Sequence, residues 1–236
     1  ILAGKVRIKD TVADNPGRLV SEDCLPVILG DPQPFSSRGG FKLEHALKQF
    51  DILPVGKTVV DVGASTGGFT DCLLQNGAEK VYAVDVGYGQ LDWKLRNDPR
   101  VICRDRKNAR TLSKEDIGET LDLAVIDVSF ISLQLVIPPL LKILKPEGQL
   151  VALVKPQFEV GKNDMEHRGI IKDPAKHISV LLELNRFIEE KEWSIINATE
   201  SPITGQKGNR EFLIHCVDNR YGKPVEENTL RKIVRN

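Results

Sequence analysis

Short apolar runs alternate with helical patterns along the chain from Lys57 onward. The runs are rich in β-branched residues, which favour strands. Because strands that alternate with helices build parallel sheets through right-handed crossovers, the pattern predicts an α/β fold with a doubly wound, mostly parallel sheet. The first five predicted strands are Thr58–Asp61, Lys80–Val86, Arg100–Cys103, Leu121–Asp127 and Gln149–Val154.

The pattern changes toward the C-terminus. Pro174–Lys191 places its apolar residues on one helical face, and two further strand-like runs follow at Trp193–Thr199 and Glu211–Val217. No long helical segment separates these two runs, so we expect them to form an antiparallel hairpin at the edge of a seven-stranded sheet. The charged segment Val225–Asn236 is predicted to be a surface helix.

The first 33 residues show a different pattern. Two short strand-like runs, Lys5–Lys9 and Leu25–Leu29, are separated by turn residues, and a proline-rich linker follows at Asp31–Pro34. This segment holds too few apolar residues to form a core of its own. We therefore predict two parts. Residues 1–33 form a partial small domain with its linker, and residues 34–236 form one large α/β domain.

A glycine-rich loop, Asp61–Thr70, lies between the first of the five strands and a helix expected to run from Gly68 to Gly77. Its glycine order, G-x-x-x-G-G, lacks the Gly-Lys-Ser/Thr end of a P-loop and the G-x-G-x-x-G spacing of a dinucleotide loop. The helix N-terminus points at the ligand, and the acid before the first glycine suits a cationic amino-acid end. These features predict S-adenosylmethionine as the cofactor. The predicted contacts from this loop are Asp61, Gly63, Ala64, Ser65, Thr66, Gly67, Gly68 and Phe69.

Acidic and amide side chains follow the next two strands. Asp85 ends the second strand and is predicted to accept hydrogen bonds from the two ribose hydroxyls of the cofactor. The alternative is that its carboxylate caps the following turn. Beyond the third strand, Asp105 or Asn108 is predicted to contact the adenine, and the alternative is that the acid only pairs with neighbouring arginines.

Two charged residues end the fourth and fifth strands, where open α/β sheets present catalytic groups. Asp127, which begins Asp127-Val128-Ser129-Phe130, is predicted to contribute to both the cofactor site and the catalytic site. Enzymes that methylate base amino groups usually carry two prolines after this acid, and their absence favours a hydroxyl acceptor over an exocyclic amine. Lys155 ends the adjoining strand, which places an ammonium beside Asp127, and the alternative is an ordinary solvated lysine.

The composition is that of a globular protein, since 41% of the residues are hydrophobic and the formal net charge is zero. A neutral chain argues against wholesale polyanion binding. However, Lys94–Arg110 holds seven basic residues against two acids, which is either a solvated face or a nucleic-acid footprint. The four cysteines lack metal-ligand or disulfide spacing, so no metal site is predicted and a reducing cytoplasm is expected. No apolar run approaches the length that spans a bilayer.

Six motifs together resemble the TlyA, or hemolysin A, family, which is similar to the FtsJ-type ribose 2′-O-methyltransferases. The motifs are Ser37–Leu43, Asp61–Thr70, Arg106–Arg110, Asp127–Phe130, Lys155–Glu159 and Lys207–Phe212. The resemblance implies a Rossmann-like, S-adenosylmethionine-dependent fold that methylates ribosomal RNA at a ribose 2′-oxygen. It also implies a Lys-Asp-Lys-Glu catalytic set, which falls on Lys42, Asp127, Lys155 and Glu211.

The resemblance further implies an N-terminal RNA-binding domain of a ribosomal-protein type, of which residues 1–33 would be the second half. The chain opens with Ile1 rather than Met, and we expect further residues upstream. Where the family commonly shows Val-Asn-Gly, this chain has Ile8-Lys9-Asp10, so the tip of that hairpin is expected to meet RNA differently. Phe130 is predicted either to stack on the target base or to face the core. The predicted RNA contacts are Lys5, Arg38, Arg106, Lys107, Arg110 and Phe130.

The chemistry expected of this site is the placement of a ribose hydroxyl in line with the sulfonium methyl, which contributes up to ~7–11 kcal/mol. Lys155 is predicted either to act as a general base or, as an ammonium, to orient the hydroxyl and stabilise the developing oxyanion. Three other functions stay open: an RNA- or ribosome-binding protein without catalysis, a small-molecule O-methyltransferase and a membrane-active hemolysin. The intact charged set disfavours the first, the basic stretch disfavours the second, and the lack of a spanning segment disfavours the third.

Overall fold

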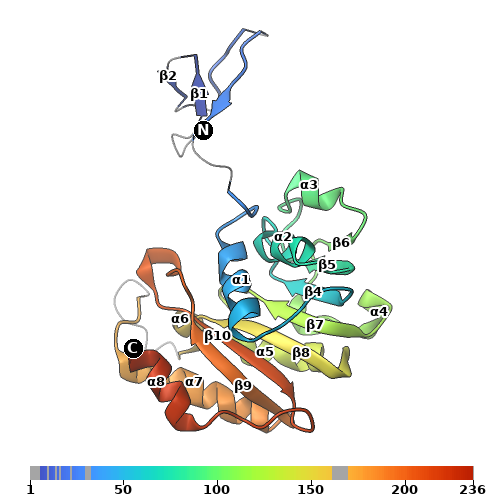
Figure 1. Ribbon diagram of the computed structural model, residues 1–236, viewed down its shortest axis with the longest axis vertical. Helices are drawn as coiled ribbons and strands as arrows, with labels where there is room; N and C mark the ends of the chain where they lie inside the picture. The colour runs from blue at the N-terminus through green and yellow to red at the C-terminus, as the bar shows by residue number, and fades with distance from the viewer. Residues whose placement is uncertain are drawn as a thin grey trace. The chain divides into compact units, whose positions relative to one another are not determined.

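The computed structural model describes residues 6–9, 11–13, 15, 17–21, 23–29, 33–160 and 170–235. The chain divides into two compact units, Ile1–Pro34 and Phe35–Asn236 (Figure 1). Each unit contains a sheet of its own. The boundary therefore falls at the end of the proline-rich segment Asp31–Pro34.

The first unit contains a three-stranded antiparallel sheet in the order β2-β1-β3. β1 (Val6–Ile8) pairs with β2 (Thr11–Val12) on one side and with β3 (Val27–Ile28) on the other. Large apolar side chains are exposed, Leu19 at 97% and Leu25 at 84%, so hydrophobic burial among the described residues contributes little here. The assignment of this unit to part of an RNA-binding domain stays a prediction.

The second unit is built on a seven-stranded sheet in the order β6-β5-β4-β7-β8-β10-β9 (Figure 1). The first five strands in this order are parallel, and β10 runs antiparallel to both of its neighbours. The predicted doubly wound sheet with an antiparallel hairpin at its edge is confirmed. The strands are β4 (Thr58–Val62), β5 (Lys80–Val84), β6 (Val101–Arg104), β7 (Leu121–Ile126), β8 (Leu144–Val154), β9 (Trp193–Glu200) and β10 (Phe212–Asp218).

Helices pack against both faces of this sheet, and side chains of the sheet contribute to a separate core on each face. The helices of one face are α1 (Gly39–Gln49), α2 (Gly68–Gln75) and α3 (Trp93–Arg96). Those of the other face are α4 (Lys114–Ile117), α5 (Leu133–Leu141), α7 (Pro174–Glu189) and α8 (Glu227–Arg235). A single helical turn, α6 (Pro156–Glu159), follows β8.

The alternation of side chains along each strand explains the two cores. In β4, Val59 joins the core under α1 and α2, whereas Val60 and Val62 join the core under α5 and α7. All three side chains are buried, and each fully buried side chain of this size contributes roughly 1.5–3 kcal/mol. Packing on both faces holds the parallel strands in register, so the loops at their carboxyl ends have a fixed support.

Several helices were not predicted individually from the sequence, namely α1, α3, α4, α5 and α6, and two of them run against local propensity. α1 begins with Gly39 and Gly40, which disfavour helix, but it buries Leu43, Ala46 and Leu47 on one face at helical spacing. α5 contains two consecutive prolines and still buries four apolar side chains against the sheet. Tertiary packing outweighs local propensity in both cases. Among the helices in the described part of the chain, none is long and apolar enough to cross a membrane.

Candidate active site

Two adjoining hollows lie where the loops follow the carboxyl ends of the parallel strands. The first hollow, about 300 Å³, lies among Lys42, Lys155 and Glu211, and the second, about 780 Å³, lies beside Asp85 and Asn108. Both sizes are those of small-molecule sites. The residues that line both hollows are Gly63, Ser65, Asp127, Ser129, Phe130 and Phe158.

The glycine-rich loop forms a wall of the first hollow, and its glycines are needed for steric reasons. Gly63 and Gly67 adopt φ values of 86° and 95°, a left-handed conformation that other residues rarely take. A Cβ at Gly63 would collide with the carbonyl oxygen of Asp127, and one at Gly68 with Ser37 Oγ. Gly63, Ala64, Ser65, Thr66, Gly68 and Phe69 line the first hollow as predicted for ligand contacts, whereas Gly67 lines neither hollow.

Asp61 lies beneath this loop. Its side chain is fully buried in β4, where Oδ2 accepts a hydrogen bond of 2.6 Å from Thr70 Oγ1 and Oδ1 has no partner among the described residues. Burial, with a smaller contribution from the neighbouring Asp127, raises the pKa of Asp61 to about 7. Asp61 lines neither hollow, so within this structure it supports the loop through Thr70.

Asp85 and Asn108 line the second hollow, but Asp105 does not. Asp85 accepts backbone hydrogen bonds from Ser65, at 2.8 Å, and from Gly87, at 2.7 Å, which leaves further lone pairs of its carboxylate available. Asp105 instead forms an ion pair with Arg96, 2.5 Å from Nη2 to Oδ2, and this pairing holds the pKa of Asp105 below its usual value. Of the two candidates for an adenine contact, only Asn108 lines this hollow, and the contact itself stays a prediction.

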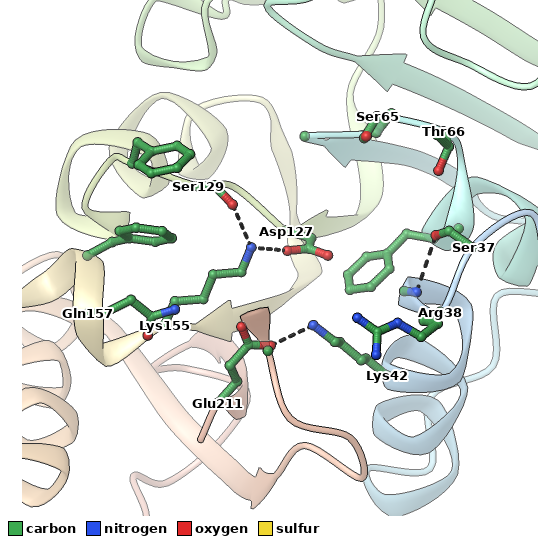
Figure 2. A pocket seen from close by; sticks show the side chains of 18 residues that line it. Ser37, Arg38, Lys42, Ser65, Thr66, Asp127, Ser129, Lys155, Gln157 and Glu211 are labelled. Carbon is green, nitrogen blue, oxygen red and sulfur yellow. Dashed lines mark hydrogen bonds and ion pairs between the residues drawn. The ribbon is translucent and has the colours of Figure 1, made fainter. Parts of the chain in front are cut away.

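The first hollow contains two ion pairs between residues that the sequence places far apart (Figure 2). Lys155 Nζ lies 2.6 Å from Asp127 Oδ1, and Lys42 Nζ lies 2.5 Å from Glu211 Oε2. Lys42 and Lys155 are each 9% exposed and Glu211 is 3% exposed, so these charges are largely removed from water. The four residues of the predicted catalytic set therefore line one hollow.

Strand pairing explains how Lys155 and Glu211 meet. Lys155 directly follows β8, Glu211 directly precedes β10, and the antiparallel register pairs Val154 with Phe212. Asp127 directly follows β7, the parallel neighbour of β8 on its other side. Lys42 reaches the same place from the sheet-facing side of α1.

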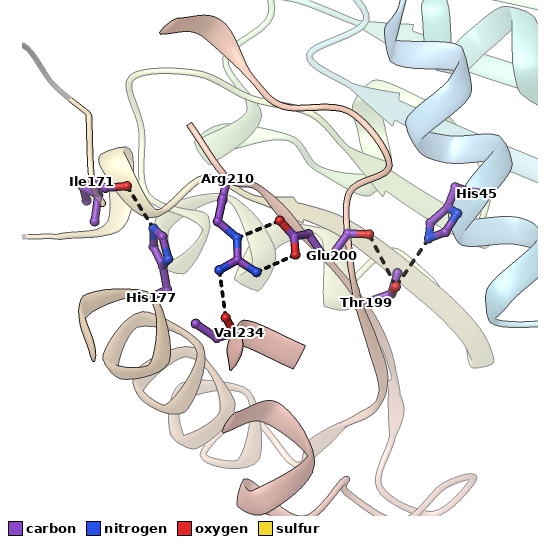
Figure 3. A network of polar contacts seen from close by, with 7 residues as sticks. All are labelled: His45, Ile171, His177, Thr199, Glu200, Arg210 and Val234. Atoms are coloured by element: carbon purple, nitrogen blue, oxygen red, sulfur yellow. Dashed lines mark hydrogen bonds and ion pairs between the residues drawn. The ribbon is translucent and has the colours of Figure 1, made fainter. Parts of the chain in front are cut away.

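A polar network holds Arg210, the residue that precedes Glu211 (Figure 3). Arg210 donates two hydrogen bonds to Glu200, at 2.7 and 2.5 Å, and a third to the carbonyl oxygen of Val234, at 2.8 Å. The hollow also includes Gly205, where a Cβ would collide with the Glu211 carboxylate. Glu211 therefore has little freedom to move away from Lys42.

The predicted RNA contacts are spread over several places. Arg38 lines the first hollow, and Lys107 and Arg110 line the second. Phe130 is 86% exposed at the mouth of both, so the core-facing alternative is wrong. Arg106 lines neither hollow and lies over the ring of Tyr88, 4.4 Å from its centroid. Lys5 falls outside the described residues.

Several members of the basic stretch have acidic partners. Lys107 pairs with Asp116 at 2.7 Å, and Arg100 pairs with Asp98 at 2.7 Å. These pairs are partly exposed, so each contributes little to stability and water or phosphate can compete for its charges.

The model of the FtsJ-like methyltransferase family matches residues 35–217, which contain both hollows. The chain belongs to the FtsJ-like methyltransferase family. TlyA of Mycobacterium tuberculosis, named a 16S/23S rRNA (cytidine-2′-O)-methyltransferase, is 45% identical over 90% of this chain and 80% of that protein. YqxC of Bacillus subtilis, a candidate rRNA methyltransferase, is 43% identical over 99% of this chain and 85% of that protein.

A solved structure of a candidate hemolysin from Streptococcus thermophilus superposes with a TM-score of 0.84 at 40% identity, covering 99% of this chain and 86% of that one. The resemblance to the TlyA family is confirmed, as is the Rossmann-like methyltransferase fold. This FtsJ-like protein is therefore an S-adenosylmethionine-dependent methyltransferase.

The second hollow of this FtsJ-like domain fits S-adenosylmethionine. The Asp85 carboxylate offers acceptors for ribose hydroxyls, and the Asn108 amide offers a polar contact for a base. Val86 and Leu135 line the same hollow, yet they are 70% and 53% exposed, and an adenine ring would cover such apolar surface. The glycine-rich loop joins this hollow to the first one, where a methyl acceptor would lie.

Some residues of the FtsJ-like site were not predicted from the sequence, although they line the first hollow. Three of them lie within motifs of the family: Ser129 follows Asp127 by two residues, and Gln157 and Phe158 follow Lys155. Their proximity to predicted catalytic residues was an available signal. Gly205 had no such signal, because it enters the site only through the turn between β9 and β10.

Proposed function

We propose that this protein methylates a ribose 2′-oxygen of ribosomal RNA, with Lys42, Asp127, Lys155 and Glu211 as its catalytic residues. The observation that carries the proposal is the Lys155–Asp127 pair, 2.6 Å apart, in a hollow that the glycine-rich loop also lines. An amine held by a carboxylate suits a hydroxyl nucleophile, which needs a proton acceptor or a cation beside its oxygen. No proline follows Asp127 to form the turn that grips an exocyclic amine.

The names of two relatives support RNA as the substrate. TlyA of Mycobacterium tuberculosis is named for 16S and 23S rRNA, and the TlyA of Campylobacter jejuni, 33% identical over 90% of this chain, is named for 23S rRNA. Both names specify the 2′-oxygen of a cytidine. We therefore infer ribosomal RNA, free or within a subunit in the cytoplasm, as the partner.

Each catalytic residue has a distinct part in this proposal. When bound, S-adenosylmethionine supplies a methyl group made electrophilic by its sulfonium. Lys155 holds the ribose hydroxyl with Nζ and either accepts its proton as a neutral amine or stabilises the developing oxyanion as an ammonium. Asp127 fixes the amine of Lys155. Lys42, itself held by Glu211, adds a second positive charge to the hollow.

The RNA would cover the loops around both hollows. Arg38, Lys107 and Arg110 are the proposed phosphate contacts, because they line the hollows with positive charge. Phe130, at 86% exposure, presents a ring on which the target base can stack. Lys5 and Arg106 stay predicted RNA contacts, with the first unit as the proposed partial RNA-binding domain.

The test is transfer of labelled methyl from S-adenosylmethionine to small subunits, large subunits, intact ribosomes and free rRNA. Modification of the 2′-oxygen makes the adjacent phosphodiester resistant to alkaline hydrolysis, which locates the ribose. We expect incorporation at a defined ribose, its loss in Lys155→Ala, and its retention in Lys48→Ala, an exposed lysine on α1. No incorporation by the wild-type protein into any of these RNAs would refute the proposal.

A further inference from the structure

Lys155 donates a hydrogen bond to Ser129 besides forming its ion pair with Asp127. Ser129 Oγ lies 3.0 Å from Lys155 Nζ, on the same amine that lies 2.6 Å from Asp127 Oδ1 (Figure 2). Ser129 lines both hollows, and no other partner of its hydroxyl is found among the described residues. The hydroxyl does not cap α5, because Ser132 performs that role.

We propose that Ser129 is a positioning residue. It orients the Lys155 amine so that the remaining N–H group or lone pair points toward the substrate. The proposal rests on the function proposed above. The hydrogen bond to Ser129 and the ion-pair contact with Asp127 occupy two sides of the Lys155 amine. A neutral amine has two N–H groups and a lone pair, so the lone pair is left for the ribose hydroxyl. An ammonium has three N–H groups, so the third is left for the ribose oxygen. In either form, these two fixed contacts determine where the remaining position points.

The loop that carries Ser129 is held at both ends. Asp127 N donates to the carbonyl oxygen of Val62 in β4, at 2.9 Å. At the other end, Glu159 accepts hydrogen bonds from Ser132 Oγ, at 2.6 Å, and from Leu133 N, at 2.9 Å. Since β4 and α6 are fixed by the sheet, the Ser129 hydroxyl has a defined place rather than an incidental one.

Phe130, the residue after Ser129, has an unfavourable backbone conformation, so contacts with the rest of the protein must hold this turn. Phe130 has a φ of 64°, a left-handed conformation that is unfavourable for a bulky residue. Its ring lies 4.9 Å from that of Phe158, which follows Lys155 by three residues. The ring contact joins the loop to α6 beside Lys155, so the strained turn keeps Ser129 Oγ against the lysine. Such strain persists only where the surrounding structure determines it, and it gathers at functional sites.

The experiment compares Ser129→Ala and Ser129→Thr with the wild-type protein. Ser179→Ala serves as the matched control, because Ser179 is an exposed serine on α7 whose hydroxyl donates to Glu183 and lines neither hollow. For Ser129→Ala we expect kcat for RNA methylation to fall about tenfold, as for loss of one hydrogen bond to a charged group, with KM for the RNA and affinity for S-adenosylmethionine within about twofold. Ser129→Thr keeps the hydroxyl and is expected to recover most of kcat. Thermal melts establish that each variant is folded.

A second readout does not depend on RNA. The ¹⁵N resonance of Lys155 Nζ, assigned by comparison with Lys155→Arg, is expected to move in Ser129→Ala and not in Ser179→Ala. An unchanged resonance, or a folded Ser129→Ala protein with wild-type kcat, would overturn the positioning role. If the wild-type protein methylates no RNA but the resonance still moves, the proposed function fails while the contact between Ser129 and Lys155 stands.

Discussion

Lys42 and Glu211 lie 169 residues apart in the sequence, and their side chains form a buried ion pair of 2.5 Å. Removing one partner of such a pair leaves an uncompensated buried charge. We predict that Glu211→Ala lowers the free energy of unfolding by about 3–5 kcal/mol, measured by urea denaturation. The double variant Lys42→Met/Glu211→Leu carries no buried charge at these positions and should regain most of that loss while staying inactive. A double variant no more stable than Glu211→Ala would contradict this account.

The absence of a side chain at Gly205 leaves space for the Glu211 carboxylate. Gly205→Ala is therefore predicted to displace Glu211 and lower kcat by about tenfold or more, with binding of S-adenosylmethionine preserved. The control is Gly118→Ala, because Gly118 has φ +88° and open space around it, and it lines neither hollow. It should lose some stability through backbone strain but keep its activity. Equal loss of activity in both variants would mean that Gly205 matters only for folding.

Replacing Lys155 by arginine distinguishes its two possible roles, general base and orienting cation. A guanidinium stays protonated at any working pH, so it can orient a hydroxyl but cannot act as a general base. We predict that a base role gives Lys155→Arg a loss of at least ~10²-fold in kcat across the pH range, measured under single-turnover conditions. Activity like that of the wild type would exclude the base role and leave orientation by a cation.

Asp85 accepts two backbone hydrogen bonds and faces the second hollow. Asp85→Ala is predicted to weaken binding of S-adenosylmethionine by about tenfold to hundredfold, measured by calorimetry, since it removes the ribose acceptor and loosens the loop at Ser65. Asp105→Ala is the comparison, because Asp105 pairs with Arg96 and lines neither hollow. It should change the affinity by less than about threefold. The reverse order of effects would make Asp105 the cofactor contact.

His215 is buried in β10 and stacks on Phe50. Its burial makes the stability of the protein decrease as the pH falls. Burial lowers its pKa to about 4, with Lys57 adding to the effect, against 6.5 in the unfolded chain. The unfolded state therefore binds more protons between these values, and stability falls as the pH decreases from about 6.5 to 4, by roughly 3 kcal/mol in total.

The measurement is the difference in unfolding free energy between the wild-type protein and His215→Gln, from pH 7.5 to about 4.5. The wild-type protein should become less stable relative to His215→Gln as the pH falls, because histidine binds a proton on unfolding and glutamine does not titrate. Asp61 contributes the opposite trend, since its raised pKa costs stability as the pH rises from about 4 to 7, but it does so in both proteins and cancels. A difference that is independent of pH would show that His215 is not buried in its neutral form.

Local patterns were sufficient for the seven strands of the large sheet, for the glycine-rich loop and for the acid at the end of β5, whereas β2 (Thr11–Val12) of the first unit was missed. These features depend on neighbours a few residues away, namely the period of apolar side chains and the steric demands of Gly63 and Gly67. The choice between Asp105 and Asn108 could not be made locally. The structure pairs Asp105 with Arg96, a residue nine positions away, and only Asn108 lines the hollow. α1 was missed for a similar reason, because burial of its apolar face outweighed two glycines at its start.

The sequence by itself determined an α/β sheet, a loop for S-adenosylmethionine, and strand ends that carry Asp127 and Lys155. The tertiary structure decided that Lys42, Glu211, Ser129 and Gly205 share one hollow with them. Side chains so distant in sequence meet only because packing on both faces of the sheet fixes the order β7-β8-β10, and because burial makes each charge require its partner.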